Sequence, residues 1–149
     1  HRVAEPIVQA DCSFDLTTRN YTFSKKQERI LFICLSILDN IADDMVVLRK
    51  MINKSLVSLL TRCIQQKSIE SVLVTLSLLK KTSIFEETVI ELTNAGSKVI
   101  PQLAHLLNTS CIEIRQEAIA TLFNLSFHRE CIGLISAGSI HSTLVALVQ

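Results

Sequence analysis

The chain has 149 residues, of which 48% are hydrophobic and 19% are charged, and its formal net charge is +1. Its three glycines and two prolines are too few for an all-β protein, which needs a turn about every 8–12 residues. A nearly neutral charge argues against nucleic acid or an anionic membrane as the main partner. Apolar runs such as Ile132 to Ile135 are far shorter than the ~18–20 residues of a membrane span. Composition therefore favours a helical protein without membrane insertion.

The first 23 residues show no sustained hydrophobic period and no signal peptide. We expect residues 1–23 to form an extended arm or linker, with Phe14, Tyr21 and Phe23 available to dock on the first helix. After this arm, apolar residues recur with the i, i+3, i+4, i+7 spacing of a helix that buries one face. These residues are Ile30, Leu31, Cys34, Leu35, Leu38 and Ile41.

An internal repeat with a period of about 42 residues runs through the rest of the chain. Three segments align: FICLSILDNIADD (32–44), LVTLSLLKKTSIF (73–85) and EAIATLFNLSFHR (117–129). In this alignment Asn40, Lys81 and Asn124 share one position, and they are 41 and 43 residues apart. The aligned segments therefore predict the same helix three times.

A second set of landmarks has the same period. Asn53, Gly96 and Gly138 are 43 and 42 residues apart, and a short amphipathic run follows each of them. Asn and Gly tolerate the left-handed conformation that ends a helix, so each landmark predicts a helix end before the next helix begins. The resulting second helices span 54–65, 98–107 and 140–148, and the longer third helices span 25–42, 68–82 and 112–127.

Three helices per unit of about 42 residues are typical of armadillo repeats. The predicted fold is therefore all-α, an armadillo-type right-handed superhelical solenoid of about three repeats over residues 24–149. Two of the repeats are complete and the flanking ones are partial. Because stacked neighbours and polar caps stabilise such arrays, we expect this segment to be part of a longer array.

The five cysteines show no disulfide or metal-binding spacing, which favours reduced thiols in the core of an intracellular protein. They are Cys12, Cys34, Cys63, Cys111 and Cys131.

Catalytic, metal and cofactor motifs are not found. His128 and Cys131 could face each other on a helix, but they lack an orienting acid and an oxyanion site. A surface histidine beside a core cysteine is the favoured interpretation. His105 and His141 have no partner at ligand spacing, and no Gly-rich phosphate loop exists. We therefore expect no enzyme, no metal and no cofactor.

The third helices of an armadillo array line its concave groove, and the position of Asn40, Lys81 and Asn124 points into it. Lys80 and Lys81 together predict a cationic patch, and Asp43 and Asp44 are better explained as a cap of the next helix than as acid–base groups. The predicted protein-binding residues are Asn40, Lys80, Lys81, Arg115 and Asn124, with Lys25, Lys26 and Arg29 at the start of the first long helix.

One known use of such a groove is not supported. Nuclear-import adaptors of this fold carry a Trp one turn before the Asn, and the Trp–Asn ladder binds basic signal peptides. This chain has no Trp, and Ser36, Ser77 and Ala120 occupy that position.

Four segments together resemble the kinesin-associated protein family, the armadillo-repeat non-motor subunit of heterotrimeric kinesin. The similarity runs from about Lys25 to the C-terminus, and Thr82 departs from it because the family tends to be apolar there. The segments are LLKKTSIF (78–85), KQERIL…LDNIADD (26–44), NKSLVSLL (53–60) and LFNLSF (122–127).

The resemblance implies a non-enzymatic adaptor that binds the tails of kinesin motor polypeptides and links them to cargo adaptors. It implies a cytoplasmic location at the cytoskeleton or cilium, in microtubule-based or intraflagellar transport. Nucleic acid and small-molecule substrates are not expected partners. One alternative is a structural armadillo-repeat component of a larger ciliary or cytoskeletal complex. Another is a junctional, vacuolar or ubiquitin-ligase-type armadillo protein.

Overall fold

The described part of the chain is entirely helical. The computed structural model describes residues 24–52, 54–94, 98–137 and 140–149, and within them it contains nine helices and no strand. The predicted all-α class is therefore confirmed. The helices are α1 (Lys25–Ile41), α2 (Met45–Ile52), α3 (Leu56–Cys63), α4 (Ile69–Thr82), α5 (Glu86–Thr93), α6 (Val99–Leu106), α7 (Ile112–Ser126), α8 (Arg129–Ala137) and α9 (Ile140–Val148).

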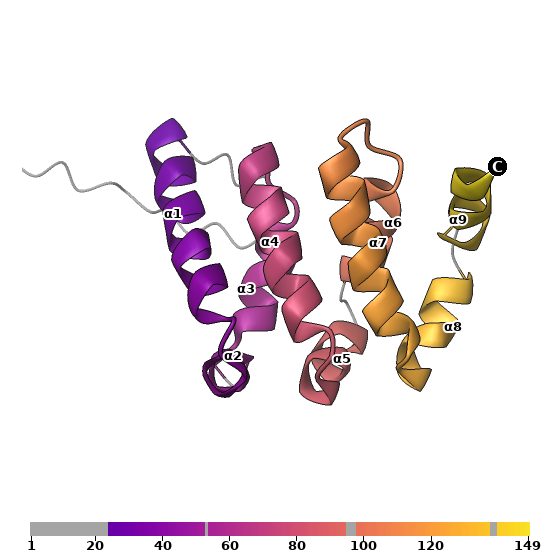
Figure 1. Cartoon of the computed structure of the whole chain (residues 1–149), viewed down its shortest axis with the longest axis horizontal. Helices are drawn as coiled ribbons and strands as arrows, with labels where there is room; N and C mark the ends of the chain where they lie inside the picture. Colours follow the sequence, from indigo (N-terminus) through magenta and orange to yellow (C-terminus); the bar gives the residue numbers. More distant parts are fainter. Residues whose placement is uncertain (1–23, 53, 95–97, 138–139) are drawn as a thin grey trace, which may run out of the picture.

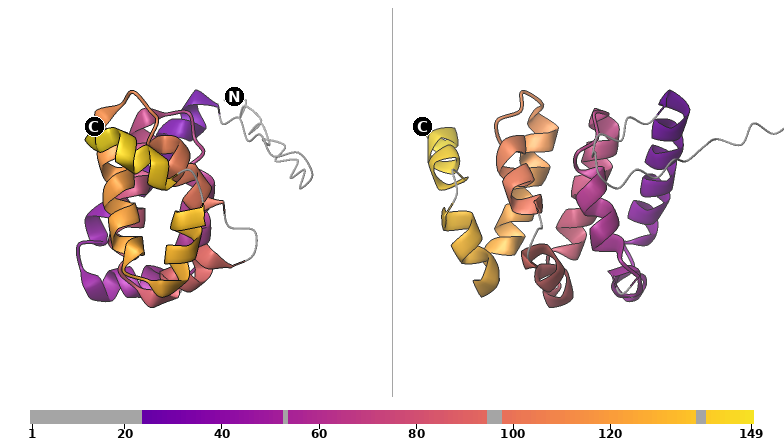
Figure 2. Two further views of the ribbon diagram at one scale, coloured as in Figure 1. Left: turned by 90° about the vertical axis from the view of Figure 1, so that its right-hand side faces the viewer. Right: turned by 180° about the vertical axis from the view of Figure 1, so that it is seen from behind.

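One long helix followed by two short ones is the order that recurs along the chain. The long helices α1, α4 and α7 have 17, 14 and 15 residues, whereas the others have 8 or 9. The long helices lie side by side, with α2 and α5 along the lower edge (Figure 1). Figure 2 shows α3 and α6 on the opposite side, where they pack on α4 and α7. The long helices thus form a layer with α4 in the middle, in contact with both α1 and α7.

The observed helices agree closely with the predicted ones. The long helices begin and end within one residue of the predicted bounds, and α3, α6 and α9 do so within two residues. The helix breaks predicted at Asn53, Gly96 and Gly138, and the arm with Phe14, Tyr21 and Phe23, lie outside the described residues. Ser55 has a left-handed backbone, with φ 64°, directly before α3.

Polar caps fix where α1 and α2 begin. Ser24 and Gln27 form a capping box, in which each side chain accepts a hydrogen bond from the other residue's backbone N–H. Asp44 Oδ1 accepts hydrogen bonds from the N–H groups of Val46 and Val47, at 2.8 and 3.0 Å. The predicted cap is therefore confirmed for Asp44.

Aliphatic side chains fill the space between the long helices and the short helices behind them. Leu76 and Leu79 of α4 are fully buried and Phe85 is nearly so. Three threonines of the long helices are also buried, but each donates its hydroxyl to a carbonyl of its own helix, so burial leaves none of these three hydroxyls unpaired. They are Thr75, Thr82 and Thr121.

The predicted burial of the apolar stripe on α1 is wrong at Ile30, Cys34 and Ile41, which are all exposed. Leu35 is the one fully buried member of that stripe. The reason is that α4 and α7 each pack on a short helix from behind, whereas α1 packs chiefly on α4. A helix with one principal neighbour buries a narrower stripe than its apolar pattern predicts.

The four described cysteines are free thiols. Cys63 and Cys131 are buried, Cys111 is half-buried, and Cys34 is exposed, so the predicted core position is wrong for Cys34. Cys12 lies outside the described residues.

No single helix of the described chain is long and apolar enough to cross a membrane. Together, 129–136 and 140–148 have that length and composition, but the two segments are bent by 78°.

Candidate protein-binding face

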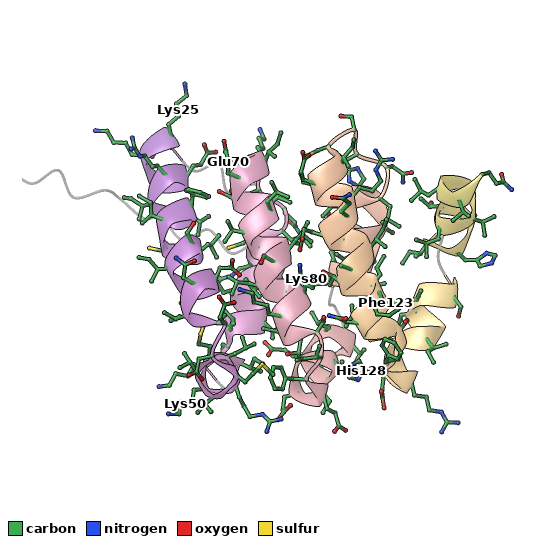
Figure 3. All side chains as sticks on the ribbon, viewed as in Figure 1. Lys25, Lys50, Glu70, Lys80, Phe123 and His128 are labelled. Atoms are coloured by element: carbon green, nitrogen blue, oxygen red, sulfur yellow. The ribbon has the colours of Figure 1, made fainter. Side chains whose placement is uncertain are left out.

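The eight predicted binding residues all belong to α1, α4 and α7, and the exposed surface of these three helices is here called the long-helix face. Lys25, Lys26 and Arg29 lie exposed in the first turns of α1, where Figure 3 shows Lys25 at the upper tip. Arg115 is half-buried in the first turn of α7. The central row comprises Asn40, Lys80, Lys81 and Asn124, near the carboxyl ends of the three long helices.

Lys81 joins α4 to α1. Its Nζ lies 2.9 Å from Asp39 Oδ1 and 2.8 Å from Asp43 Oδ1, and it donates a hydrogen bond of 2.8 Å to the carbonyl oxygen of Asp39. Only 24% of the Lys81 side chain is exposed, so the ammonium group is screened little by solvent. Ser77 adds a hydrogen bond to Asp39 Oδ1 at 3.0 Å.

Lys80 joins α4 to α7 on the other side. Its Nζ lies 2.8 and 3.0 Å from the two carboxylate oxygens of Glu117, and both side chains are about one-third exposed. Adjacent lysines therefore point to opposite neighbours of α4, as the turn of about 100° between successive helical residues requires.

A side-chain contact to the preceding long helix is repeated at the aligned position. Lys81 donates to the carbonyl of Asp39, and Asn124 Nδ2 donates to the carbonyl of Lys80 at 3.0 Å. In both cases the acceptor is the residue just before the aligned position of the preceding long helix. One turn beyond Asn124, His128 Nε2 lies 3.0 Å from the carbonyl oxygen of Ser83.

The two lysines are surrounded by compensating charge. Three carboxylates, from Asp39, Asp43 and Glu117, lie within 3.0 Å of the two ammonium groups. The pattern of two adjacent lysines predicted a cationic patch, but the acidic partners come from 37 to 42 residues away and were not apparent in the sequence. That these lysines bind a partner stays a prediction.

The pKa of Lys81 is raised above its ordinary value. Partial burial opposes the charged form, but hydrogen bonds to Asp43 and Asp39 and the negative charge of both carboxylates outweigh that effect. Lys81 therefore remains protonated in the folded chain beyond the pH at which an unfolded lysine loses its proton.

A hollow of about 390 Å³ opens beside the central row. Lys80, Lys81 and Asn124 contribute to its wall, together with Asp43, Met45 and Ile84. Met45 and Ile84 are about half exposed, so the hollow has an apolar rim and a charged wall.

Two exposed phenylalanines, Phe123 in the last turn of α7 and Phe127 directly after it, were not predicted as binding residues. Phe123 and Phe127 are 61% and 73% exposed, and their rings meet edge to face with centroids 5.0 Å apart. Both lie in the segment LFNLSF, whose four-residue spacing of aromatic residues was the available signal. Large exposed aromatic residues are frequent in protein-binding surfaces.

The predicted arrangement of His128 and Cys131 is only partly correct. Cys131 is buried as expected, and burial raises the pKa of its thiol, with a smaller contribution from Glu130, which disfavours the reactive thiolate. His128 is half-buried rather than fully exposed, because it reaches back to α4. His105 and His141 are exposed. Among the described residues, no group of three or more His, Cys, Asp or Glu side chains could hold a metal ion.

A sequence model described as Kinesin-associated protein (KAP) matches residues 2–149. The chain belongs to the kinesin-associated protein family. The match covers nearly the whole chain, including the residues that precede α1. No solved structure matches the chain. Membership of the kinesin-associated family suggests an adaptor role alongside kinesin.

Replacing Lys81 with Met should lower the free energy of unfolding by about 1–3 kcal/mol, because two carboxylates lose their shared cation and a carbonyl loses its donor. Urea unfolding followed by circular dichroism measures this. Lys67→Met is the matched control, since Lys67 is exposed between α3 and α4. It should change stability by less than about 0.5 kcal/mol. Equal effects of the two substitutions would contradict a structural role for Lys81.

The stability difference between the original chain and Lys81→Met should depend on pH in one direction. A raised lysine pKa contributes its full stabilisation below the unfolded value of about 10.4, and the contribution is lost as pH rises through the folded value. The difference should therefore stay constant from about pH 7 to 9 and shrink above about pH 10.4. Unfolding curves of both proteins across this range test it, and a difference that grows at alkaline pH would be the opposite result.

Proposed function

We propose that the chain is a non-enzymatic scaffold that binds the tails of kinesin motor polypeptides and links them to cargo adaptors. The observation that carries this proposal is the match to the kinesin-associated protein family over residues 2–149. The proposed setting is cytoplasmic, at the cytoskeleton or cilium, in microtubule-based transport. The proposed fold is an armadillo-type right-handed solenoid.

The order of the helices supports the armadillo proposal. The helices α2, α3 and α4 form one short–short–long unit, and α5, α6 and α7 repeat it. The long helix α1 and the short pair α8 and α9 then belong to partial units on either side. Such stacked units present extended faces for protein partners.

The outer side of α1 supports a longer array. Ile30, Ile33 and Ile37 are 61%, 48% and 56% exposed. Their aligned counterparts in α4 lie on the side of that helix that bears Ser77 and Lys81, the residues that contact α1. Those counterparts, Ser71, Val74 and Leu78, are buried or half-buried. We therefore propose that a further unit stacks on α1 through these isoleucines.

The eight predicted residues have different proposed roles in partner binding. Lys25, Lys26 and Arg29 are exposed and attract acidic stretches of a motor tail. Lys80 and Lys81 form ion pairs with carboxylates on or next to the neighbouring helices. They therefore contact a partner only through the exposed part of each side chain. Asn40, Arg115 and Asn124 add polar contacts along the long-helix face, and Phe123 and Phe127 add apolar area.

Binding of the chain to purified kinesin motor-tail polypeptides tests the proposal directly. Reversing the charge of Lys25, Lys26 and Arg29 to Glu together should weaken tail binding by about tenfold or more, since several exposed attractions become repulsions. Titration calorimetry measures the affinity, and circular dichroism checks that helicity is retained.

The matched control reverses Lys54, Arg62 and Lys98, which are exposed on or directly before α3 and α6, the short helices behind the long-helix layer. This control should leave tail binding within about twofold of the original. If a version of the chain extended at both ends binds no motor tail, the adaptor proposal is wrong. That result would favour a structural component of a ciliary or cytoskeletal complex.

A further inference from the structure

A second hollow lies outside the long-helix face, between α2 and the start of α5. It has a volume of about 550 Å³ and is lined by Met45, Val46, Arg49, Lys50 and Phe85. The first four residues are spaced i, i+1, i+4 and i+5 along α2, so they share one side of that helix. This surface is here called the α2–α5 hollow, and none of the eight predicted binding residues lines it.

The rim of the α2–α5 hollow is apolar and exposed. Met45 and Val46 are 51% and 65% exposed, whereas Phe85 is nearly buried and forms the floor. Exposed apolar side chains at the edge of a hollow are typical of surfaces that receive a partner's side chain. A methionine at such a rim can adapt its shape to different apolar groups.

Arg49 is held in place at the wall of the hollow. Its guanidinium carbon lies 5.1 Å from the centre of the Phe85 ring, a cation–π contact. Its Nε is 3.8 Å from Glu87 Oε1, at the limit of an ion pair, and the side chain remains 60% exposed. The cation is therefore positioned by the ring but only weakly neutralised.

The charge balance of this hollow differs from that of the central row. Around Lys80 and Lys81, three carboxylates compensate two cations. The lining of the α2–α5 hollow holds two cations, Arg49 and Lys50, and no carboxylate. Among the described residues, Arg49 forms an ion pair with Glu87 and Lys50 forms none. Figure 3 shows Lys50 at the lower edge of the molecule, away from the central row. The hollow thus combines an apolar rim with positive charge that is only partly compensated.

The α2–α5 hollow is continuous with the hollow beside the central row. Met45 belongs to both, and Ile84, which lines the latter, is the chain neighbour of Phe85 in the former. A segment lying across Met45 would therefore have apolar surface on both sides of it. The cations on the α2 side are Arg49 and Lys50, whereas those on the other side, Lys80 and Lys81, are already paired with carboxylates.

We infer that the α2–α5 hollow binds an acidic–apolar segment of a partner protein. A bulky apolar side chain of that segment rests on Met45 and Val46, and neighbouring carboxylates pair with Arg49 and Lys50. A basic segment would leave these cations unmatched and repelled. The site adjoins the long-helix face at Met45, but the inference does not rest on motor-tail binding.

Two fluorescent synthetic peptides with the same Leu and Phe residues, one carrying Glu and the other Lys between them, test the inference on the full chain. The Glu peptide should bind and the Lys peptide should not, and rising salt should weaken binding because the cations are exposed. Fluorescence anisotropy measures both affinities. If the Glu peptide does not bind, or if the two peptides bind equally, the inference is overturned.

Two substitutions locate the peptide on the chain. Lys50→Glu and Val46→Glu should each weaken binding of the Glu peptide by about tenfold, since each places a carboxylate in the hollow. Their matched controls are Lys67→Glu and Ile132→Glu, which change an exposed lysine and a half-exposed apolar residue elsewhere. Controls that weaken binding as much as the test substitutions would overturn the inference. All four positions are exposed, and circular dichroism confirms that each variant retains its helices.

Discussion

The contact that the layer of long helices depends on is a side chain of one helix donating to a carbonyl near the end of the preceding one. The last four carbonyls of an α-helix lack a partner within the helix and carry its partial negative charge. Asp39 and Lys80 lie in the last turns of α1 and α4, and Lys81 and Asn124 donate to their carbonyls. The same position of each unit therefore completes the helix before it, which fixes how successive long helices stand beside one another.

This use of the aligned position changes what the long-helix face can offer a partner. Lys80 and Lys81 bind neighbouring helices first, and three carboxylates compensate their charge. Free positive charge then lies at the edges of the described molecule, at the start of α1 and on α2. An acidic partner would therefore bind at these edges more readily than at the central row. Apolar residues such as Phe123 and Met45 would supply contact area near the central row.

Much of the fold could be predicted from the sequence, because helix periodicity, caps and a repeat of about 42 residues are local or regularly spaced signals. The long helices were predicted to within a residue, and Asp44 was predicted as a cap. The ion pairs of Lys80 and Lys81 could not be predicted, since their partners lie about one repeat away and many surface carboxylates were possible partners. The exposure of Ile30 and Cys34 was not predicted, because an apolar pattern does not show how many other helices a helix packs on.

A double-mutant cycle between Lys81 and Asp39 tests the central claim most directly. The free energies of unfolding of Lys81→Met, Asp39→Ala and the double variant, compared with the original chain, isolate the interaction between these two residues. Asp39→Ala removes the carboxylate but keeps the backbone carbonyl, so the account predicts a coupling free energy of about 1–3 kcal/mol for the ammonium–carboxylate pair. It also predicts that Lys81→Met still lowers stability by about 1 kcal/mol in the Asp39→Ala background, where the bond to the carbonyl remains to be lost. If Lys81→Met costs less than about 0.3 kcal/mol in the Asp39→Ala background, the two helices are held together without the bond to the carbonyl.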